Sequence, residues 1–151
     1  ETTSQIIELM LQSDFTGQNL LDMGSGTGVL AILAKKLGSA TTVAIDNDEW
    51  AYRNALDNIR LNDENEIIVE LGDASSLNDR QFDVILANIN RNILLRYMKE
   101  YVKCLVDGGK IFFSGFYEED LVLIAKEAER LGLTYSNQVK KNNWTAAVFV
   151  K

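Results

Sequence analysis

Three glycines at alternating positions near the start of the chain separate a short apolar run from a helical pattern. Apolar residues at 19–23 predict a buried strand, which ends in the segment Asp22-Met23-Gly24-Ser25-Gly26-Thr27-Gly28. Residues 29–37 then carry apolar side chains at helical spacing, and Gly38 marks the end of that helix. A tight turn alone needs one glycine, whereas three let the backbone approach a bound molecule. We therefore expect a ligand site where this strand turns into this helix, as in open α/β sheets.

Strand-like and helix-like segments alternate along most of the chain. The pattern predicts strands at 19–23, 41–45, 66–71, 82–87 and 110–114, and helices at about 2–13, 29–37, 48–61, 91–106 and 118–131. Asp107-Gly108-Gly109 is expected to break the chain between the fourth of these helices and the strand that follows. Two final extended runs, 133–139 and 144–150, flank 140–143 and predict a β-hairpin. The predicted fold class is therefore α/β: a Rossmann-like, doubly wound, mostly parallel seven-stranded sheet with a C-terminal antiparallel hairpin and helices on both faces.

Composition excludes several classes of function. The 151 residues suit one soluble domain, so we expect a single domain over 1–151. With no histidine, a Ser-His-Asp triad, a His-ligated zinc and a His general base are excluded, and we expect no metal. One cysteine suits a reducing cytoplasm, and no apolar run is long enough to cross a membrane. A net charge of −7 argues against direct binding of nucleic acid.

Two ligand classes suit the glycine turn. The run Gly26 to Ala31 satisfies the G-x-G-x-x-A pattern of dinucleotide sites, and Asp46 lies about where their ribose-binding acid belongs. Asp22 argues against a dinucleotide, because a carboxylate just before the turn would repel a diphosphate. S-adenosyl-L-methionine has no phosphate, and its ammonium group can pair with Asp22 directly or through water. Its carboxylate can be received by the helix N-terminus and by the N–H groups of the glycines, which include Gly24, Gly26 and Gly28.

Three further polar residues follow expected strands at the same edge of the sheet. Asp46 can accept hydrogen bonds from both ribose hydroxyls, or it can cap the next helix, a role that suits Asp48 equally. Asp73 can accept from an adenine amino group, or it can belong to a simple turn. Asn88 can orient a substrate amine through its side-chain carbonyl, or it can cap a helix, which Asn90 does more naturally. We interpret Asp46 and Asn88 as ligand-facing and leave Asp73 open.

Five segments, taken in order, resemble the catalytic domain of the bacterial ribosomal protein L11 methyltransferases, a class I S-adenosylmethionine-dependent family. They are Glu1-Thr2-Thr3-Ser4, the run from Leu21 to Gly28, Ala44-Ile45-Asp46-Asn47-Asp48, Leu86-Ala87-Asn88-Ile89 and Phe113-Ser114-Gly115. The glycine run is general to the superfamily, whereas the Thr-Thr pair joined to Ala-Asn-Ile is more specific. Asn90 departs from the apolar residue that is usual in the family, next to the expected substrate.

The resemblance implies cofactor contacts at Thr3, Gly24, Asp46 and Asn88. It also implies methylation of lysine side chains and of the N-terminal amine of a ribosomal protein, with S-adenosyl-L-homocysteine as product. In this family a small N-terminal domain recruits the substrate, and the abrupt start at Glu1 leads us to expect a piece of a longer chain.

The expected enzyme is a cytoplasmic monomer in which Asn88 is catalytic, orienting the amine while water takes the proton. Other readings stay open. They are a methyltransferase acting on a small molecule, a nucleobase or another protein, a nicotinamide-dependent dehydrogenase, and a module that binds S-adenosylmethionine without catalysis.

Overall fold

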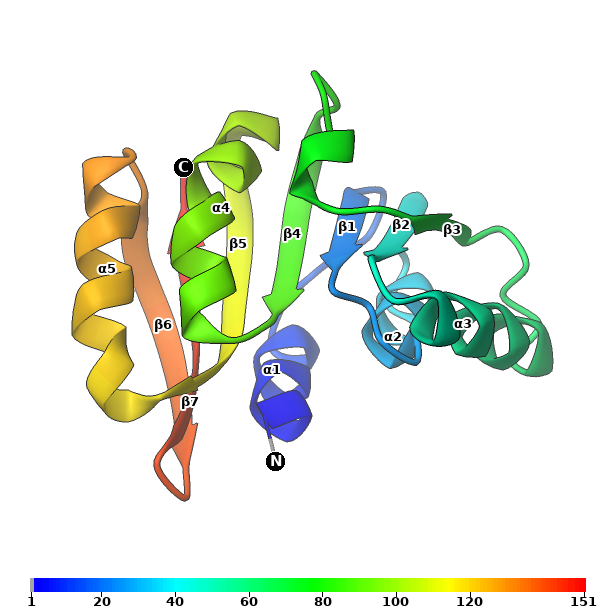
Figure 1. The fold of residues 1–151 in the computed structure, drawn as a ribbon, viewed down its shortest axis with the longest axis horizontal. Coiled ribbons are helices and arrows are strands. Elements are labelled where there is room, and N and C mark those ends of the chain that lie inside the picture. The colour runs from blue at the N-terminus through cyan, green and yellow to red at the C-terminus, as the bar shows by residue number, and fades with distance from the viewer. Residues whose placement is uncertain (1) are drawn as a thin grey trace.

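The computed structural model describes residues 2–151 and folds them around one mixed sheet (Figure 1). The strand order across the sheet is β3-β2-β1-β4-β5-β7-β6. Strands from β3 to β5 run parallel, whereas β7 pairs antiparallel with both β5 and β6. The strands are β1 (Asn19–Met23), β2 (Thr41–Asp46), β3 (Ile68–Leu71), β4 (Phe82–Asn88), β5 (Leu105–Tyr117), β6 (Thr134–Lys141) and β7 (Trp144–Val150). The predicted seven-stranded sheet with its antiparallel hairpin is confirmed.

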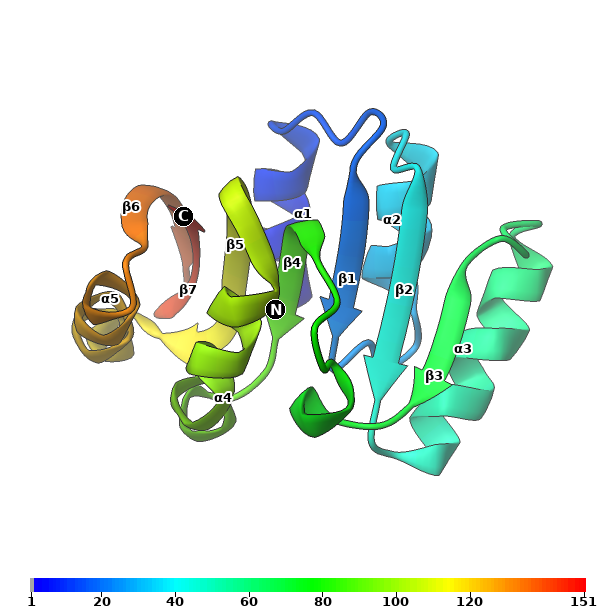
Figure 2. The same cartoon turned by 90° about the horizontal axis from the view of Figure 1, so that it is seen from above.

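Helices cover both faces of the sheet. Seen from above, α1 and α2 lie on one side, and α4 and α5 lie on the other (Figure 2). The helices are α1 (Thr2–Leu11), α2 (Val29–Lys36), α3 (Glu49–Leu61), α4 (Arg91–Cys104) and α5 (Leu121–Arg130), with single 3-10 turns η1 (Ala74–Ser76) and η2 (Glu118–Asp120). Side chains alternate along each strand, so β1 sends Leu20 toward α1 and α2 but Leu21 toward α4.

Most element boundaries match the prediction, but the boundary between α4 and β5 does not. Asp107-Gly108-Gly109 does not separate α4 from a short strand, because β5 begins directly at Leu105. The strand is irregular here, and its pairing with β4 shifts between Phe82 and Val84. The N–H group of Gly108 donates to the Lys151 carbonyl at 2.8 Å, and the Lys151 N–H group donates to Gly109 at 3.0 Å. Pairing with the end of the chain, which the local pattern does not show, therefore lengthens the strand.

The polar residues singled out above meet at one edge of the sheet. The arrowheads of β1, β2 and β4 point the same way in Figure 1, so the turns that follow these strands are neighbours. The α1 helix begins beside the end of β4, which brings Thr3 into hydrogen-bond range of Asn88. Glu1, the first residue of one motif quoted above, lies outside the described residues. Across residues 2–151, no helix combines the length and apolar character needed to span a bilayer.

Candidate functional site

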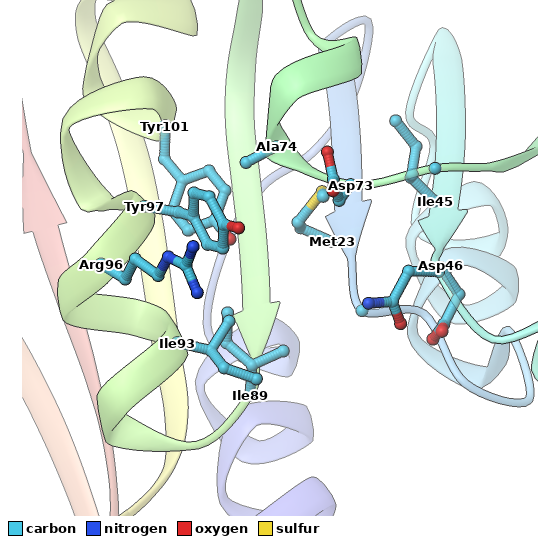
Figure 3. Close-up of a pocket in the computed structure, with 13 residues that line it drawn as sticks. Met23, Ile45, Asp46, Asp73, Ala74, Ile89, Ile93, Arg96, Tyr97 and Tyr101 are labelled. Carbon is cyan, nitrogen blue, oxygen red and sulfur yellow. The ribbon is translucent and has the colours of Figure 1, made fainter.

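A pocket of about 230 Å³ opens where β1, β2, β3 and β4 end against α4. We call it the strand-end pocket, and Figure 3 shows side chains from α4 facing the turns after β2 and β3 across it. Its lining combines carboxylates, aromatic rings, aliphatic side chains and one guanidinium. The lining residues are Met23, Gly24, Ile45, Asp46, Asn47, Gly72, Asp73, Ala74, Ile89, Ile93, Arg96, Tyr97 and Tyr101.

Asp46 enters the pocket from the last position of β2 and is held by backbone donors. Its Oδ2 accepts from the Gly26 N–H group at 2.8 Å, and its Oδ1 accepts from the Asp48 N–H group at 3.0 Å. Asp48 caps α3 by accepting from Ala51 N–H at 3.0 Å. Asp48 is therefore confirmed as the cap. Each Asp46 oxygen keeps further acceptor capacity for a diol.

Asp73 enters the same pocket from the turn after β3. Its Oδ1 accepts hydrogen bonds from the side chain and the backbone N–H group of Ser75. These bonds, led by the hydroxyl, hold the pKa of the Asp73 carboxyl below its usual value, and the positive charge of Arg96 acts in the same direction. Asp73 is thus both a turn residue and a pocket residue, so the two readings left open are compatible.

Asp22 takes a different position from the one its neighbours suggest. Side chains alternate along β1, so Met23 lines the pocket while Asp22 points toward α2 on the opposite face. Its Oδ2 accepts from the Ala31 N–H group at 3.1 Å, and its buried Oδ1 has no hydrogen-bond partner among the described residues. Burial raises the pKa of Asp22 to about 7. The carboxylates that line the pocket are therefore Asp46 and Asp73.

The glycine turn shapes the pocket, but the N–H groups of its three glycines already have hydrogen-bond acceptors within the protein. The N–H groups of Gly24, Gly26 and Gly28 donate to the Ile45 carbonyl, to Asp46 and to the Ser25 carbonyl respectively. Each of these N–H groups therefore has a partner within the protein, and that they receive a ligand carboxylate stays a prediction. Gly24 has φ +71°, and a methyl group there would lie 2.4 Å from Ile89 Cγ2. Gly24 thus lets the turn close against Ile89, whereas Gly26 and Gly28 lie outside the pocket lining.

Asn88 lies beside the pocket, at the end of β4, in a small hydrogen-bonded cluster. Its Nδ2 donates to Thr3 Oγ1 at 3.3 Å, and its Oδ1 accepts from Ser114 Oγ at 2.9 Å. Asn90 accepts from the Ile93 N–H group at 3.1 Å and so caps α4, as predicted. Asn88 is therefore not needed as a cap.

A second cavity of about 490 Å³, here named the outer cleft, lies next to this cluster. Its wall includes a tilted aromatic pair, Tyr117 and Trp144, with ring centroids 4.2 Å apart, and the carboxylate of Glu119. The remaining lining residues are Asn90, Arg91, Asn92, Gly115, Phe116 and Asp120. Among residues 2–151, no group of three or more His, Cys, Asp or Glu side chains is arranged to hold a metal ion.

The structure thus brings Gly24, Asp46 and Asp73 together in one pocket and places Thr3 and Asn88 together beside it. No residue of the α4 wall, to which Tyr97 and Tyr101 belong, was named as a site residue from the sequence. Ile93, Tyr97 and Tyr101 recur at every fourth position and so share one helix face. That spacing, on the helix after the fourth strand, was the available signal. Tyr101 is also part of the core, so packing and pocket lining are not exclusive.

Known proteins resemble this chain over almost its whole length. The family described as Ribosomal protein L11 methyltransferase (PrmA) matches residues 1–151. The ribosomal protein L11 methyltransferases of Bacteroides fragilis and Bacteroides thetaiotaomicron are 52% and 50% identical, each over 99% of this chain and 54% of the relative. The chain therefore spans about half the length of the curated relatives it matches.

Solved structures agree with this family match. The crystal structure of ribosomal protein L11 methylase from Lactobacillus delbrueckii subsp. bulgaricus superposes with a TM-score of 0.94 at 25% identity, over 99% of this chain and 78% of that one. A methyltransferase from Pyrococcus furiosus has the same fold, with a TM-score of 0.81 at 21% identity, over 96% of this chain and 81% of that one.

Proposed function

The chain belongs to the ribosomal protein L11 methyltransferase (PrmA) family, and we propose that it transfers a methyl group from S-adenosylmethionine to amino groups of a ribosomal protein. The observation that carries the proposal is the arrangement at one sheet edge. Two carboxylates, Asp46 and Asp73, line the strand-end pocket, and the Asn88 amide lies beside it. A nucleoside needs acceptors for its hydroxyl and amino groups, whereas an amine nucleophile needs an acceptor that orients it.

The pocket residues suit an adenosyl ligand better than a dinucleotide. Asp46 offers acceptors for a ribose diol, and Asp73 offers an acceptor for an amino group. Ile89, Ile93 and Tyr97 supply apolar and aromatic surface for a purine ring. The Gly26 N–H group already donates to a carboxylate, so this part of the turn is unfavourable for a diphosphate.

The glycine turn also has room and unused polar atoms for a methionine head group. A methyl group at Gly26 would have no atom within 4 Å, so the turn is open there. Ser25 Oγ in this turn and Asp22 Oδ1 near the end of β1 are both buried and have no partner among residues 2–151. We propose that Asp22 influences the head group across the glycine turn, without lining the pocket. We also propose that Thr3, Gly24, Gly26 and Gly28 complete the cofactor site.

When bound, S-adenosylmethionine supplies a methyl group already activated by a positively charged sulfur. The work of the chain is therefore to hold a neutral amine in place. A lysine amine has a pKa of about 10.4 in water, and desolvation in a closed site lowers it. Asn88 Oδ1 has acceptor capacity beyond the Ser114 bond and can take an N–H bond from the amine. With no histidine in the chain, we propose that water takes the proton released.

The outer cleft suits the amine-bearing partner. Glu119 follows β5 and lines this cleft, where its carboxylate favours an approaching lysine-rich segment, whereas Glu118 next to it is paired with Lys140. The Tyr117 and Trp144 rings can contact the aliphatic part of a lysine or its ammonium. We propose lysine side chains and the N-terminal amine as methyl acceptors. An enzyme with this ribosomal substrate would work in the cytoplasm.

Calorimetry tests the proposal at the level of the ligand. Binding of S-adenosylmethionine and S-adenosylhomocysteine, with no response to NADH, is the expected result. Binding of NADH alone would identify a nicotinamide-dependent enzyme and overturn the proposal. The acceptor is then tested with a radiolabelled methyl donor and purified ribosomal proteins, using the natural full-length protein. Label in a large-subunit protein at lysine or the N-terminus is expected, and label in a small molecule alone would contradict the ribosomal substrate.

A further inference from the structure

We propose that Ser114 on β5 is a positioning residue that aims the Asn88 amide at the substrate amine. The proposal rests on the methyltransferase function above and adds a residue that acts on the reaction only through Asn88. Ser114 is fully buried, lines neither the strand-end pocket nor the outer cleft, and so does not touch the reacting groups itself.

A hydrogen bond joins the two side chains across neighbouring strands. Ser114 pairs with Asn88 in the parallel register of β4 and β5, and its Oγ donates to Asn88 Oδ1 at 2.9 Å. The Thr3 hydroxyl contacts the other end of the amide at 3.3 Å. The terminal torsion of an asparagine is otherwise broad, so two hydroxyls on opposite sides narrow the range of amide orientations. One lone pair of Oδ1 remains for a substrate N–H group.

The backbone next to Ser114 holds the residue after Asn88 as well. The Ile89 N–H group donates to the Ser114 carbonyl at 3.1 Å. Gly115 follows with φ +93°, and a methyl group there would lie 2.6 Å from the Ile89 carbonyl oxygen. The pairing of β5 with β7 is irregular at this point, between Ser114 and Phe116. The Ser114-Gly115 step therefore holds Asn88 through one side-chain bond, and it holds Ile89, the next residue, through one backbone bond and close backbone packing.

A positioning role and a packing role of Ser114 predict different effects on kcat. If Ser114 only packs the sheet, removing its hydroxyl lowers stability and leaves the kcat of correctly folded enzyme unchanged. If it aims Asn88, the loss lowers kcat while cofactor affinity is retained, because Asp46 and Asp73 do not contact it. The effect must also vanish once the Asn88 amide is gone.

A double-mutant cycle tests this claim in the natural full-length protein. The variants are Ser114→Ala, Asn88→Ala and the double variant, assayed for kcat, KM of the acceptor and Kd of S-adenosylmethionine. We expect Ser114→Ala to lower kcat about 10-fold with Kd changed less than 2-fold, the scale of one lost hydrogen bond. In the Asn88→Ala background, the same change should have no further effect on kcat. Ser39→Ala is the matched control, because it removes the buried hydroxyl contact to Thr42 away from the site, and its kcat should equal wild type.

The possible outcomes separate this inference from the proposed function. A Ser114→Ala kcat within 2-fold of wild type overturns the positioning role. An equal loss with and without Asn88, or an equal loss in Ser39→Ala, does so too. If wild type neither binds S-adenosylmethionine nor transfers its methyl group, the proposed function fails first. Should Ser114→Ala not fold, Ser114→Cys keeps the volume but donates weakly, and wild-type kcat in that variant would equally overturn the role.

Discussion

The carboxyl edge of the sheet has an acid side and an amide side, and they are built in different ways. On the acid side, Asp73 bonds to Ser75 within its own turn, and Asp46 bonds to the N–H group two residues later as well as to that of Gly26, 20 positions earlier. On the amide side, Asn88 bonds to Thr3, 85 positions away, and to Ser114, 26 positions away. The acid side is thus largely shaped by local turns, whereas the amide side exists only after α1 and β5 have docked.

Because of this difference, the acid side suits ligand binding and the amide side suits the orientation of the reacting amine. Groups held by local turns keep their geometry when distant parts of the chain move, which suits a binding pocket. The positions of groups held by distant elements depend on the packing of the whole domain, which suits the orientation of a reacting amine. Substitutions should therefore separate binding from turnover.

Asn88→Ala should break the amide side most severely. The change removes the acceptor that we propose for the amine, and a misplaced nucleophile costs about 100-fold in turnover. Affinity for S-adenosylmethionine should fall far less, because the acid side is intact. Steady-state kinetics and calorimetry on the same preparation measure both quantities, and near-wild-type turnover would remove the role of Asn88.

Gly115→Ala should damage the support of the amide side. The new methyl group would meet the Ile89 carbonyl at 2.6 Å in a left-handed backbone conformation, so we expect a loss of about 2–3 kcal/mol in the free energy of unfolding. Gly132→Ala is the matched control, since Gly132 has a similar φ of +90° but no atom within 4 Å of the added methyl group. Urea unfolding that shows equal losses in both variants would contradict the close-contact argument.

Asp46→Asn should act on the acid side and have the opposite consequence to Asn88→Ala: cofactor binding should weaken while turnover is nearly unchanged. Asp46 accepts from two backbone N–H groups, so an amide nitrogen in its place would face a donor. We expect S-adenosylmethionine to bind about 10-fold more weakly, with the kcat at saturation nearly unchanged. Asp48→Ala is the control, because it removes only the cap of α3 and should lower stability by about 1 kcal/mol while affinity stays the same.

Asp22→Asn should have the smallest effect and sharpens the contrast between pocket and buried acids. Burial raises the pKa of Asp22 from 3.8 to about 7, so the folded state binds this proton more tightly than the unfolded state. The stabilisation is complete below about pH 4 and is lost as the pH rises through 7. Wild type should therefore lose stability relative to Asp22→Asn, by on the order of 1 kcal/mol, between pH 6.5 and pH 8. Urea titrations at the two pH values measure this, and a constant difference would contradict the raised pKa.

The sequence predicted the elements, and the position of Asp46 and Asp73 at one edge of the sheet, because both depend on local rules. Alternating apolar runs gave the strands, and Asp48 and Asn90 were expected as caps from their positions before helices. Asp22 was expected to face the ligand because it adjoins the glycines. Its direction depends instead on which face of the sheet each β1 residue occupies, and that follows from packing against α2 and α4.

By itself, the order of residues determined that this chain is an alternating α/β domain with a glycine turn after the first strand, because hydrophobic periodicity and turn chemistry act over a few residues. Only the tertiary structure decided that α4 supplies the far wall of the pocket, that Asp22 is buried on the other face, and that Ser114 reaches Asn88. Those relations join residues far apart in the chain, and they are set by strand register and by the side of the sheet on which each helix packs.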